Sequence, residues 1–181
     1  MNGVSNIVLR RATLADAPAI AQVRVDSWRA TYRGIMPDDY LDAMQVDESI
    51  DMWERVLSAP ANRMAAVFVV EVEAQIVGFA AGHMLPEPKF DLAAELTAIH
   101  LLPAAQDKGL GTRLLQMVAQ TFFDLQANGM LVWTLSENKI GRTFYEKMGA
   151  ELLIEQSYTW DDLDLKEVGY GWRDLSALAL G

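Results

Sequence analysis

Apolar residues recur along the chain at two different spacings, and these spacings separate strands from helices. Short runs of β-branched and aromatic residues predict strands, whereas apolar positions three and four residues apart predict helices. Strands are expected at residues 7–11, 65–73, 76–84, 96–103, 130–135, 151–160 and 163–172. Helices are expected at residues 13–33, 38–44, 47–57, 110–128 and 138–148. This order predicts an α/β protein (an α+β mixed sheet of six to seven strands) with helices on both faces.

Local signals mark several element boundaries. Thr13 and Asp16 have the spacing of a capping box, and Pro37 suits the first position of a helix. Residues 59–62, Ala-Pro-Ala-Asn, are expected to stop a helix, and the proline-containing stretch 85–89 is expected to form a loop. No repeat or linker interrupts the pattern, so residues 1–181 are expected to form a single domain.

The stretch from Gln106 to Thr112 stands between a predicted strand and a predicted helix. Its two glycines, Gly109 and Gly111, allow a tight turn whose backbone N–H groups meet the positive end of the helix dipole. Such a turn favours an anion, and a phosphate group is the natural guest. Taken alone the motif is weak, and an ordinary strand-to-helix turn is the competing interpretation.

Charge and composition restrict the partners. Twenty-five acidic and fifteen basic residues give a formal net charge of −10, which repels nucleic acid and attracts a cationic small molecule, although solubility alone explains it as well. The longest run without a charged residue, 74–86, is too short to cross a membrane, so no membrane association is expected. Residues 1–6 lack the features of an export signal, so a cytoplasmic location is expected.

The chain contains no cysteine and only two histidines, His83 and His100. This excludes thiolate ligands and cysteine nucleophiles, and the two histidines show no zinc spacing, so no metal site is expected. Simple alternation places His100 with Ala98 and Leu102, opposite Glu95. His100 is therefore expected to pack under the sheet rather than to act as an acid or base.

A second motif occupies residues 136–150, Ser-Glu-Asn-Lys-Ile-Gly-Arg-Thr-Phe-Tyr-Glu-Lys-Met-Gly-Ala, directly after a predicted strand. With this motif downstream of the glycine turn, the chain resembles the GNAT superfamily of acetyl-CoA-dependent N-acetyltransferases. The resemblance covers about residues 7–172 and is strongest over 95–149. It implies the GNAT fold and a chain that moves an acetyl group from acetyl-CoA.

The resemblance also implies a cofactor site. The main chain at the end of the central strand is expected to pair with the pantetheine arm, the glycine turn to bind the pyrophosphate, and Asn138 to touch the pantetheine or its bound water. Gln106 takes the family's Gln or Arg position at the head of the turn. The strand residues are Ile99, His100 and Leu101, and those of the turn are Asp107, Lys108, Gly109, Leu110, Gly111 and Thr112.

Three catalytic roles follow from the same resemblance. Tyr145 matches the family tyrosine that protonates the departing thiolate, although packing on the sheet is its alternative role. The N–H of Leu101 is expected to polarise the acetyl oxygen. Glu95 is the candidate general base, acting directly or through a water, because an ammonium must lose its proton before attack. Its competing role is that of a solvated acid at the strand end, or of an acid that only binds a cationic acceptor. Many relatives use water chains instead of a glutamate.

The acceptor side is expected to include Trp28, Tyr32 and Tyr158. Residues 28–37 resemble a segment of a bacterial branch that includes polyamine acetyltransferases, and aromatic rings suit the aliphatic chain of an amine. Packing in the core is the competing role of Trp28 and Tyr32, which lie four residues apart on a helix.

The resulting hypothesis is transfer of an acetyl group to a small cationic or polyamine-like primary amine, by direct attack in a ternary complex. Two alternatives remain open: acetylation of a protein N-terminus or lysine, and a non-catalytic acyl-CoA sensor. Pairing of two copies through the C-terminal strands is expected by analogy, with Trp160, Tyr170 and Trp172 supplying aromatic area.

Overall fold

A seven-stranded mixed sheet forms the centre of the protein in a computed structural model that describes residues 6–58 and 65–179. The strand order is β1-β2-β3-β4-β5-β7-β6, and only the β4–β5 pair is parallel. This confirms the predicted mixed α/β fold. The strands are β1 (Ile7–Arg11), β2 (Ala65–Val72), β3 (Gln75–Lys89), β4 (Leu92–Leu101), β5 (Met130–Leu135), β6 (Glu151–Trp160) and β7 (Leu163–Trp172).

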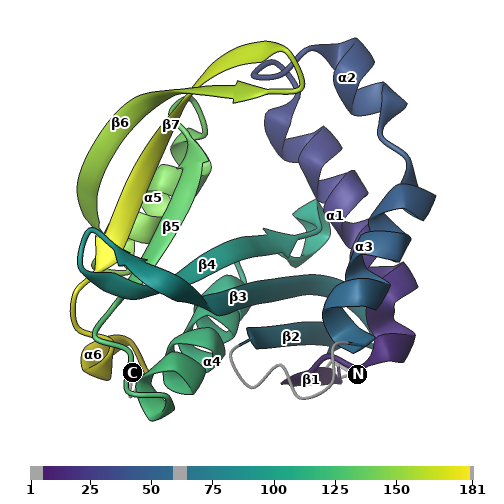
Figure 1. Cartoon of the computed structure of the whole chain (residues 1–181). Coiled ribbons are helices and arrows are strands. Elements are labelled where there is room, and N and C mark those ends of the chain that lie inside the picture. Colours follow the sequence, from purple (N-terminus) through teal and green to yellow (C-terminus); the bar gives the residue numbers. More distant parts are fainter. Residues whose placement is uncertain (1–5, 59–64, 180–181) are drawn as a thin grey trace.

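Helices cover both faces of the sheet (Figure 1). One face carries α1 and α3, the other carries α4 and α6, and α5 packs behind β5 and β7. Two 3-10 turns, η1 (Leu14–Asp16) and η2 (Pro103–Ala105), precede α1 and α4. The helices are α1 (Ala17–Tyr32), α2 (Asp38–Ala43), α3 (Val46–Ser58), α4 (Leu110–Asp124), α5 (Lys139–Lys147) and α6 (Ser176–Ala179).

The predicted capping box is confirmed and also anchors the edge of the sheet. The Thr13 N–H donates to the Asp16 carboxylate at 2.7 Å. Arg10 of β1 pairs with Asp16 at 2.7 Å and also with Glu71 of β2. The guanidinium lowers the pKa of Asp16 to about 2. These contacts fix the start of α1, the helix that carries Trp28 and Tyr32.

Three predicted elements have other boundaries. The central strand, expected at 96–103, is β4 and runs from Leu92 to Leu101, and the 3-10 turn η2 follows it. The stretch 85–89 does not form a loop but continues β3 to Lys89, which pairs with Leu92. The prolines are tolerated because the register slips between Met84 and Lys89, which leaves this part of the strand exposed. The fourth long helix ends at Asp124 rather than at 128, because Gln126 turns the chain with a φ of 63°. The expectations for residues 1–5 and 59–62 lie outside the described residues.

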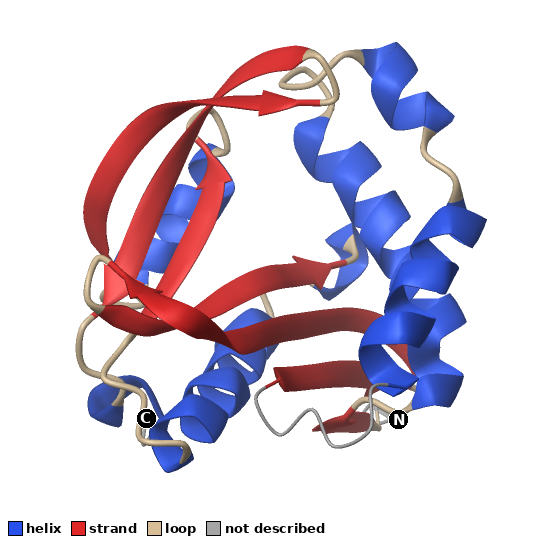
Figure 2. Cartoon of the chain, in the orientation of Figure 1, coloured by secondary structure: helices blue, strands red, loops and turns tan. Residues whose placement is uncertain are grey.

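The sheet divides between β4 and β5. These strands pair over only three positions, Ala94–Leu96 against Met130–Val132, and then diverge, as Figure 2 shows. Beyond Leu96, the backbone edge of β4 that faces β5 has no strand partner. The divergence therefore separates the strands β1–β4 from the strands β5–β7 and opens the middle of the sheet.

The tip of the β6–β7 hairpin reaches the segment between α1 and α2 and closes the upper side of this opening (Figure 1). The indole N–H of Trp160 donates to the Tyr40 hydroxyl, which donates to Asp161 at 3.2 Å. Tyr170 and Trp172, expected to supply a dimer surface, are instead buried in the core against α5. The aromatic argument for pairing through the C-terminal strands is therefore wrong for these two residues.

Candidate functional site

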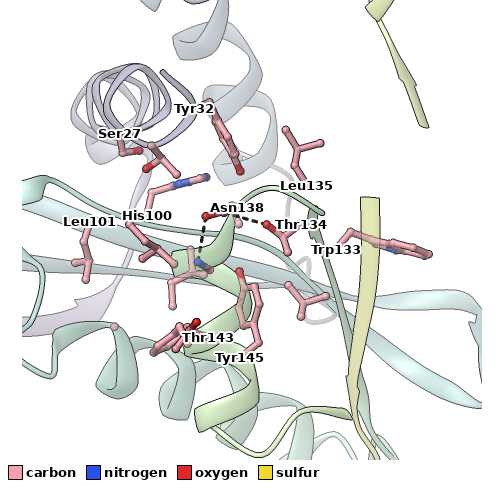
Figure 3. A pocket seen from close by; sticks show the side chains of 18 of the residues that line it. Ser27, Tyr32, His100, Leu101, Trp133, Thr134, Leu135, Asn138, Thr143 and Tyr145 are labelled. Atoms are coloured by element: carbon pink, nitrogen blue, oxygen red, sulfur yellow. Dashed lines mark hydrogen bonds between the residues drawn. The ribbon is translucent and has the colours of Figure 1, made fainter. Parts of the chain in front are cut away.

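A cleft of about 920 Å³ runs through the divergence between β4 and β5. It is continuous from the turn before α4, past the start of α5, to α1 and the β6–β7 hairpin. Figure 3 shows its middle, where Tyr32 of α1 and Tyr145 of α5 point from opposite sides toward Thr134 and Asn138. Elements far apart in the sequence therefore meet at one place.

The backbone at the end of β4 forms one wall of the cleft. The N–H of Leu102 donates to the carbonyl of Val77 at 2.9 Å. Leu101 and Gly78 are therefore a non-hydrogen-bonded pair, in which the N–H and C=O groups of each residue point away from the other strand. The N–H of Leu101 therefore faces the gap toward β5, and by alternation so does the N–H of Ile99. The backbone of His100 faces β3, so of the three predicted strand residues only two offer free main-chain groups.

The glycine turn is held against this wall. Asp107 and Gly109 have φ values of 59° and 73°, so two left-handed positions precede the first turn of α4. The Gln106 amide donates to the carbonyl of Leu101 at 3.1 Å, which fixes the turn to the end of β4. Gly111 lines the cleft, and a side chain added there would approach Leu101 and Phe144. The loop can therefore direct N–H groups toward an anion.

The turn residues differ in what their side chains do. Asp107 and Thr112 line the cleft, whereas Lys108 is exposed and is not part of the lining. Leu110, the first residue of α4, is buried in the core, so only its backbone is available to a ligand.

Asn138 is the N-cap residue directly before α5, and its side chain is buried. Its side-chain carbonyl oxygen accepts from the Gly141 N–H at 3.1 Å, and its side-chain NH₂ donates to the Thr134 hydroxyl at 3.0 Å (Figure 3). A Cβ at Gly141 would lie 2.6 Å from the Asn138 amide nitrogen, so the side chain fits only because residue 141 is glycine. Thr134 and Gly141 were not predicted as site residues; the i+3 spacing from a helix cap was the available signal for Gly141.

Tyr145 lies in the floor of the cleft, packed against Phe144, Tyr170 and Trp172. Burial raises the pKa of its phenol well above the ordinary value of 10, so the hydroxyl is protonated at neutral pH. The hydroxyl makes no hydrogen bond to any residue among 6–58 and 65–179. A protonated, uncommitted donor therefore faces the cleft.

Aromatic side chains line the far end of the cleft. Trp28 lies 5.0 Å from Tyr32 and 6.0 Å from Trp160, and Tyr158 lies 6.2 Å from Trp160, measured between ring centroids. All four contribute to the lining. Trp28 and Tyr32 also pack with the residues around α2. Packing in the core, the competing role given for them from the sequence, therefore does not exclude a place in the cleft lining.

A bulge in β4 reverses the predicted direction of Glu95. Ala98 pairs with Ala81 and Leu96 with Gly82, so Thr97 is an extra residue, and its hydroxyl donates to the Ala81 carbonyl at 3.0 Å. The bulge shifts the alternation by one residue, so even-numbered positions before it and odd-numbered positions after it pack on the α4 face. These positions are Ala94, Leu96, Ile99 and Leu101. Glu95 therefore lies on the face that carries α1, together with His100, and the expectation that the two lie on opposite faces is wrong.

The surroundings of Glu95 raise its pKa. Burial is the main cause, and the carboxylate of Glu167 adds to it, whereas His83 and Lys89 act in the opposite direction. Glu95 lies beside His83 across the β3–β4 pair and is not part of the cleft lining, but Glu167 of β7 is. Of the two carboxylates, only that of Glu167 therefore reaches the cleft.

His100 packs against Phe79, with ring centroids 5.5 Å apart, and its imidazole also lines the cleft (Figure 3). Burial and the nearby Arg24 lower its pKa to about 4, so the ring is neutral at pH 7. Within residues 6–58 and 65–179, no three His, Asp or Glu side chains are grouped to hold a metal ion. None of the described helices is long and apolar enough to span a membrane.

Comparison with known proteins agrees with this arrangement. The family described as acetyltransferase (GNAT) matches residues 24–150. The uncharacterized N-acetyltransferase YuaI of Bacillus subtilis is 35% identical over 173 residues, which cover 95% of this chain and 96% of that protein.

Two solved structures share the fold. PaiA N-acetyltransferase from Thermoplasma acidophilum, in complex with coenzyme A, superimposes with a TM-score of 0.71 at 19% identity, covering 90% of this chain and 98% of that one. YncA from Salmonella typhimurium, with acetyl-CoA, gives a TM-score of 0.69 at 19% identity, covering 92% of this chain and 93% of that one.

The divided sheet, the glycine turn fixed to the end of β4 and the family match over most of the chain lead to one assignment. The protein belongs to the GNAT family and is an acetyl-CoA-dependent N-acetyltransferase.

Proposed function

We propose that the protein transfers the acetyl group of acetyl-CoA to the primary amine of a small molecule, by direct attack in a ternary complex. The observation that carries the proposal is the single cleft that joins the glycine turn, Tyr145 and an aromatic end. A cofactor and an acceptor that enter this cleft from its two ends meet beside Tyr145. Holding the two reactants in one geometry supplies much of the rate enhancement in such reactions.

The residues at the turn fit the cofactor. The N–H groups of Ile99 and Leu101, which face the gap toward β5, suit an extended amide-containing arm, and the left-handed positions at Asp107 and Gly109 suit a pyrophosphate. Asn138 adds a polar side chain to the lining of the same cleft. Acetyl-CoA, when bound, supplies the acetyl group as a thioester. The N–H of Leu101 is the donor best placed to bind a developing oxyanion.

Tyr145 is proposed as the general acid. Its hydroxyl is protonated at neutral pH and has no partner among the described residues, so it can give a proton to a thiolate within its reach. Glu95 is proposed as the base, acting through water because its side chain does not line the cleft directly. Its raised pKa moves the carboxylate toward the range in which a base works best at neutral pH.

A small acceptor is supported over a peptide by the closed end of the cleft. The β6–β7 tip meets α2 through Trp160, Tyr40 and Asp161, and this contact joins the two sides of the cleft at its aromatic end. The carboxylates of Glu95 and Glu167 and the net charge of −10 favour an acceptor with a positive amine end. A polyamine-like amine is therefore one candidate.

An amine panel tests the proposal. Release of free thiol from acetyl-CoA is measured with spermidine, aminoglycosides, amino acids and short peptides, and acetyl-CoA binding is measured in parallel by calorimetry. Turnover with small amines and none with peptides is expected. Preferred turnover of peptides would indicate a protein acetyltransferase, and tight acetyl-CoA binding without any turnover would indicate a sensor.

Three expectations from the sequence remain predictions: action in the cytoplasm, absence of nucleic-acid and membrane partners, and a homodimer. The exposed edge of β6 is the remaining structural argument for a dimer, since β6 is the last strand of the sheet. Light scattering coupled to size-exclusion chromatography decides the oligomeric state.

A further inference from the structure

The guanidinium of Arg24 on α1 lies partly buried without a counter-ion. Of the arginines that are not fully exposed, Arg10, Arg29 and Arg142 donate hydrogen bonds to other residues. Arg24 forms no ion pair and donates no side-chain hydrogen bond to any residue among 6–58 and 65–179. A partly buried cation without an anionic partner is costly, so the site favours an oxyanion.

Arg24 lies next to the acceptor end of the cleft, beside Trp28, although its own side chain is not part of the lining. Its guanidinium carbon lies 4.8 Å from the centre of the Trp28 ring, one helical turn away. Trp28 lines the cleft, as do Tyr32 and His100. Burial raises the pKa of Tyr32 and the charge of Arg24 opposes this rise, whereas burial and the charge of Arg24 both lower the pKa of His100. Burial is also the main cause of a lowered pKa at Arg24, but an arginine remains charged at neutral pH.

Trp28 provides a second donor without an acceptor. Its indole N–H is buried and has no hydrogen-bond partner among the described residues. A guanidinium that stacks on a ring keeps its N–H groups free at its edge, where they match the two oxygens of a carboxylate. Arg24 and Trp28, one turn apart on α1, thus both carry donors that have no acceptor among residues 6–58 and 65–179.

The β7 side of the cleft has the opposite charge. Glu167 of β7 lines the cleft and its charge acts on Glu95, whereas on the α1 side Arg24 lies outside the lining, over the ring of Trp28. A molecule with an ammonium group and an oxyanion complements both walls. A polyamine has no oxyanion and would bring additional positive charge toward Arg24.

We propose that Arg24 binds an oxyanion of the acceptor, so that the preferred acceptor is a small primary amine that also carries a carboxylate or a comparable acidic group. The inference rests on the proposed function and narrows it from amines in general to zwitterionic, amino-acid-like amines. Arg24 is then a specificity-determining residue that contacts the acceptor and takes no part in proton transfer.

Matched substrates test the inference without any mutation. Leucine, leucinamide and isopentylamine share one side chain, as do lysine and cadaverine, and only leucine and lysine carry the carboxylate. The kcat/KM of leucine should exceed that of both its analogues by about 10- to 100-fold, the effect expected of a charge-assisted hydrogen bond. Because leucine lies between its analogues in amine basicity, a ranking by basicity alone would place it in the middle.

A substitution locates the effect. Arg24→Gln should lower kcat/KM for the carboxylate-bearing amines by about 10- to 100-fold, while isopentylamine changes less than about threefold. Arg24→Lys should retain part of the discrimination, since a lysine keeps the charge but not the planar fork. The matched control is Arg55→Gln on α3, which removes an exposed arginine and should change nothing. Acetyl-CoA affinity should be the same in all variants.

The outcomes separate the two proposals. Turnover of cadaverine and isopentylamine as efficient as that of lysine and leucine would overturn the role of Arg24 and leave the proposed function intact. An equal loss for all amines in Arg24→Gln would overturn it as well. Absence of turnover with every amine, alongside tight acetyl-CoA binding, would overturn the proposed function and this inference with it.

Discussion

At the scale of single residues, the chemistry depends on side chains whose properties come from burial. Tyr145 is an ordinary helix residue by its sequence position, yet packing against Phe144, Tyr170 and Trp172 holds its phenol protonated and leaves the hydroxyl free. Glu95 differs from other acids of the chain in the same way, because burial raises its pKa. Environment therefore distinguishes these two residues from others of their type.

Replacing Tyr145 by phenylalanine should lower kcat by about 100-fold or more while leaving acetyl-CoA affinity unchanged, since only the donated proton is removed. The hydroxyl has no described partner, so the thermal midpoint should also stay unchanged. Steady-state kinetics and calorimetry measure the two effects. A variant with full kcat would show that the thiolate takes its proton from water.

Replacing Glu95 by glutamine should lower kcat and remove the acidic limb of its pH profile. A base works only when deprotonated, so wild-type activity should rise with pH through the raised pKa of Glu95, above the ordinary range of a glutamate. A pH series from 5 to 9 with both proteins measures this. An unchanged profile in Glu95→Gln would exclude Glu95 as the base.

Stability provides the control for this variant. A carboxyl whose pKa is raised on folding stabilises the fold below its unfolded pKa, and that contribution is lost as pH rises through the folded pKa. Glu95→Gln should therefore be no less stable than the wild type at pH 8, by thermal unfolding. A loss of activity together with a loss of stability would point to a structural role instead.

At the scale of elements, two local irregularities position the site. The bulge at Thr97 turns Glu95 to the α1 face of the sheet, and the cap at Asn138 fixes the start of α5. Each depends on a hydrogen bond between a side chain and the backbone. The Thr97 hydroxyl donates to the Ala81 carbonyl, and the Gly141 N–H donates to the side-chain oxygen of Asn138. The regular parts of β4 and α5 follow from their apolar pattern, but the direction of the functional side chains depends on these departures.

Replacing Gly141 by alanine should displace the Asn138 side chain, because the added Cβ would lie 2.6 Å from its amide nitrogen. Loss of the cap should cost about 1 kcal/mol of stability and raise the Kd for acetyl-CoA several-fold, despite the higher helix propensity of alanine. Thermal unfolding and calorimetry measure these effects. Glu137→Ala, directly before the cap but exposed and outside the cleft lining, is the control. Higher stability in Gly141→Ala would contradict this account of the cap.

At the scale of the whole molecule, the two parts of the sheet meet through only three residue pairs of β4 and β5. A ligand between the strands bridges them and binds the folded state alone. Acetyl-CoA at 100 times its Kd should stabilise the protein by about 2.7 kcal/mol and raise the thermal midpoint by about 5–10 °C. Differential scanning fluorimetry measures the shift, and CoA without the acetyl group is a useful comparison.

Amide hydrogen exchange locates this bridging. The N–H groups of Ile99 and Leu101 face the gap and should gain protection when acetyl-CoA binds, whereas that of His100 faces β3 and should change little. His100 is thus a control within the same strand. Equal changes at all three amides would mean that the ligand acts on the stability of β4 as a whole.

The spacing of apolar residues and the turn residues of the sequence predicted several strand boundaries and the glycine turn. The strands at 130–135, 151–160 and 163–172 have the predicted boundaries, because each is a run rich in apolar, β-branched and aromatic residues next to a polar turn at 136–137 or 161–162. The glycine turn was visible as well, since left-handed φ values and a helix start depend on local sequence. The predicted family assignment is confirmed by the match over residues 24–150.

Only the tertiary structure decided which of these residues meet. The divergence of β4 and β5, the contact of the β6–β7 tip with α2 and the unpaired charge of Arg24 depend on partners far away in the chain. The bulge at Thr97 has no signal in the alternation, because an inserted residue shifts the phase without changing the apolar composition. Local sequence fixes backbone preference and polarity, whereas packing between distant elements fixes which side chains share a cavity and which charges remain without a partner.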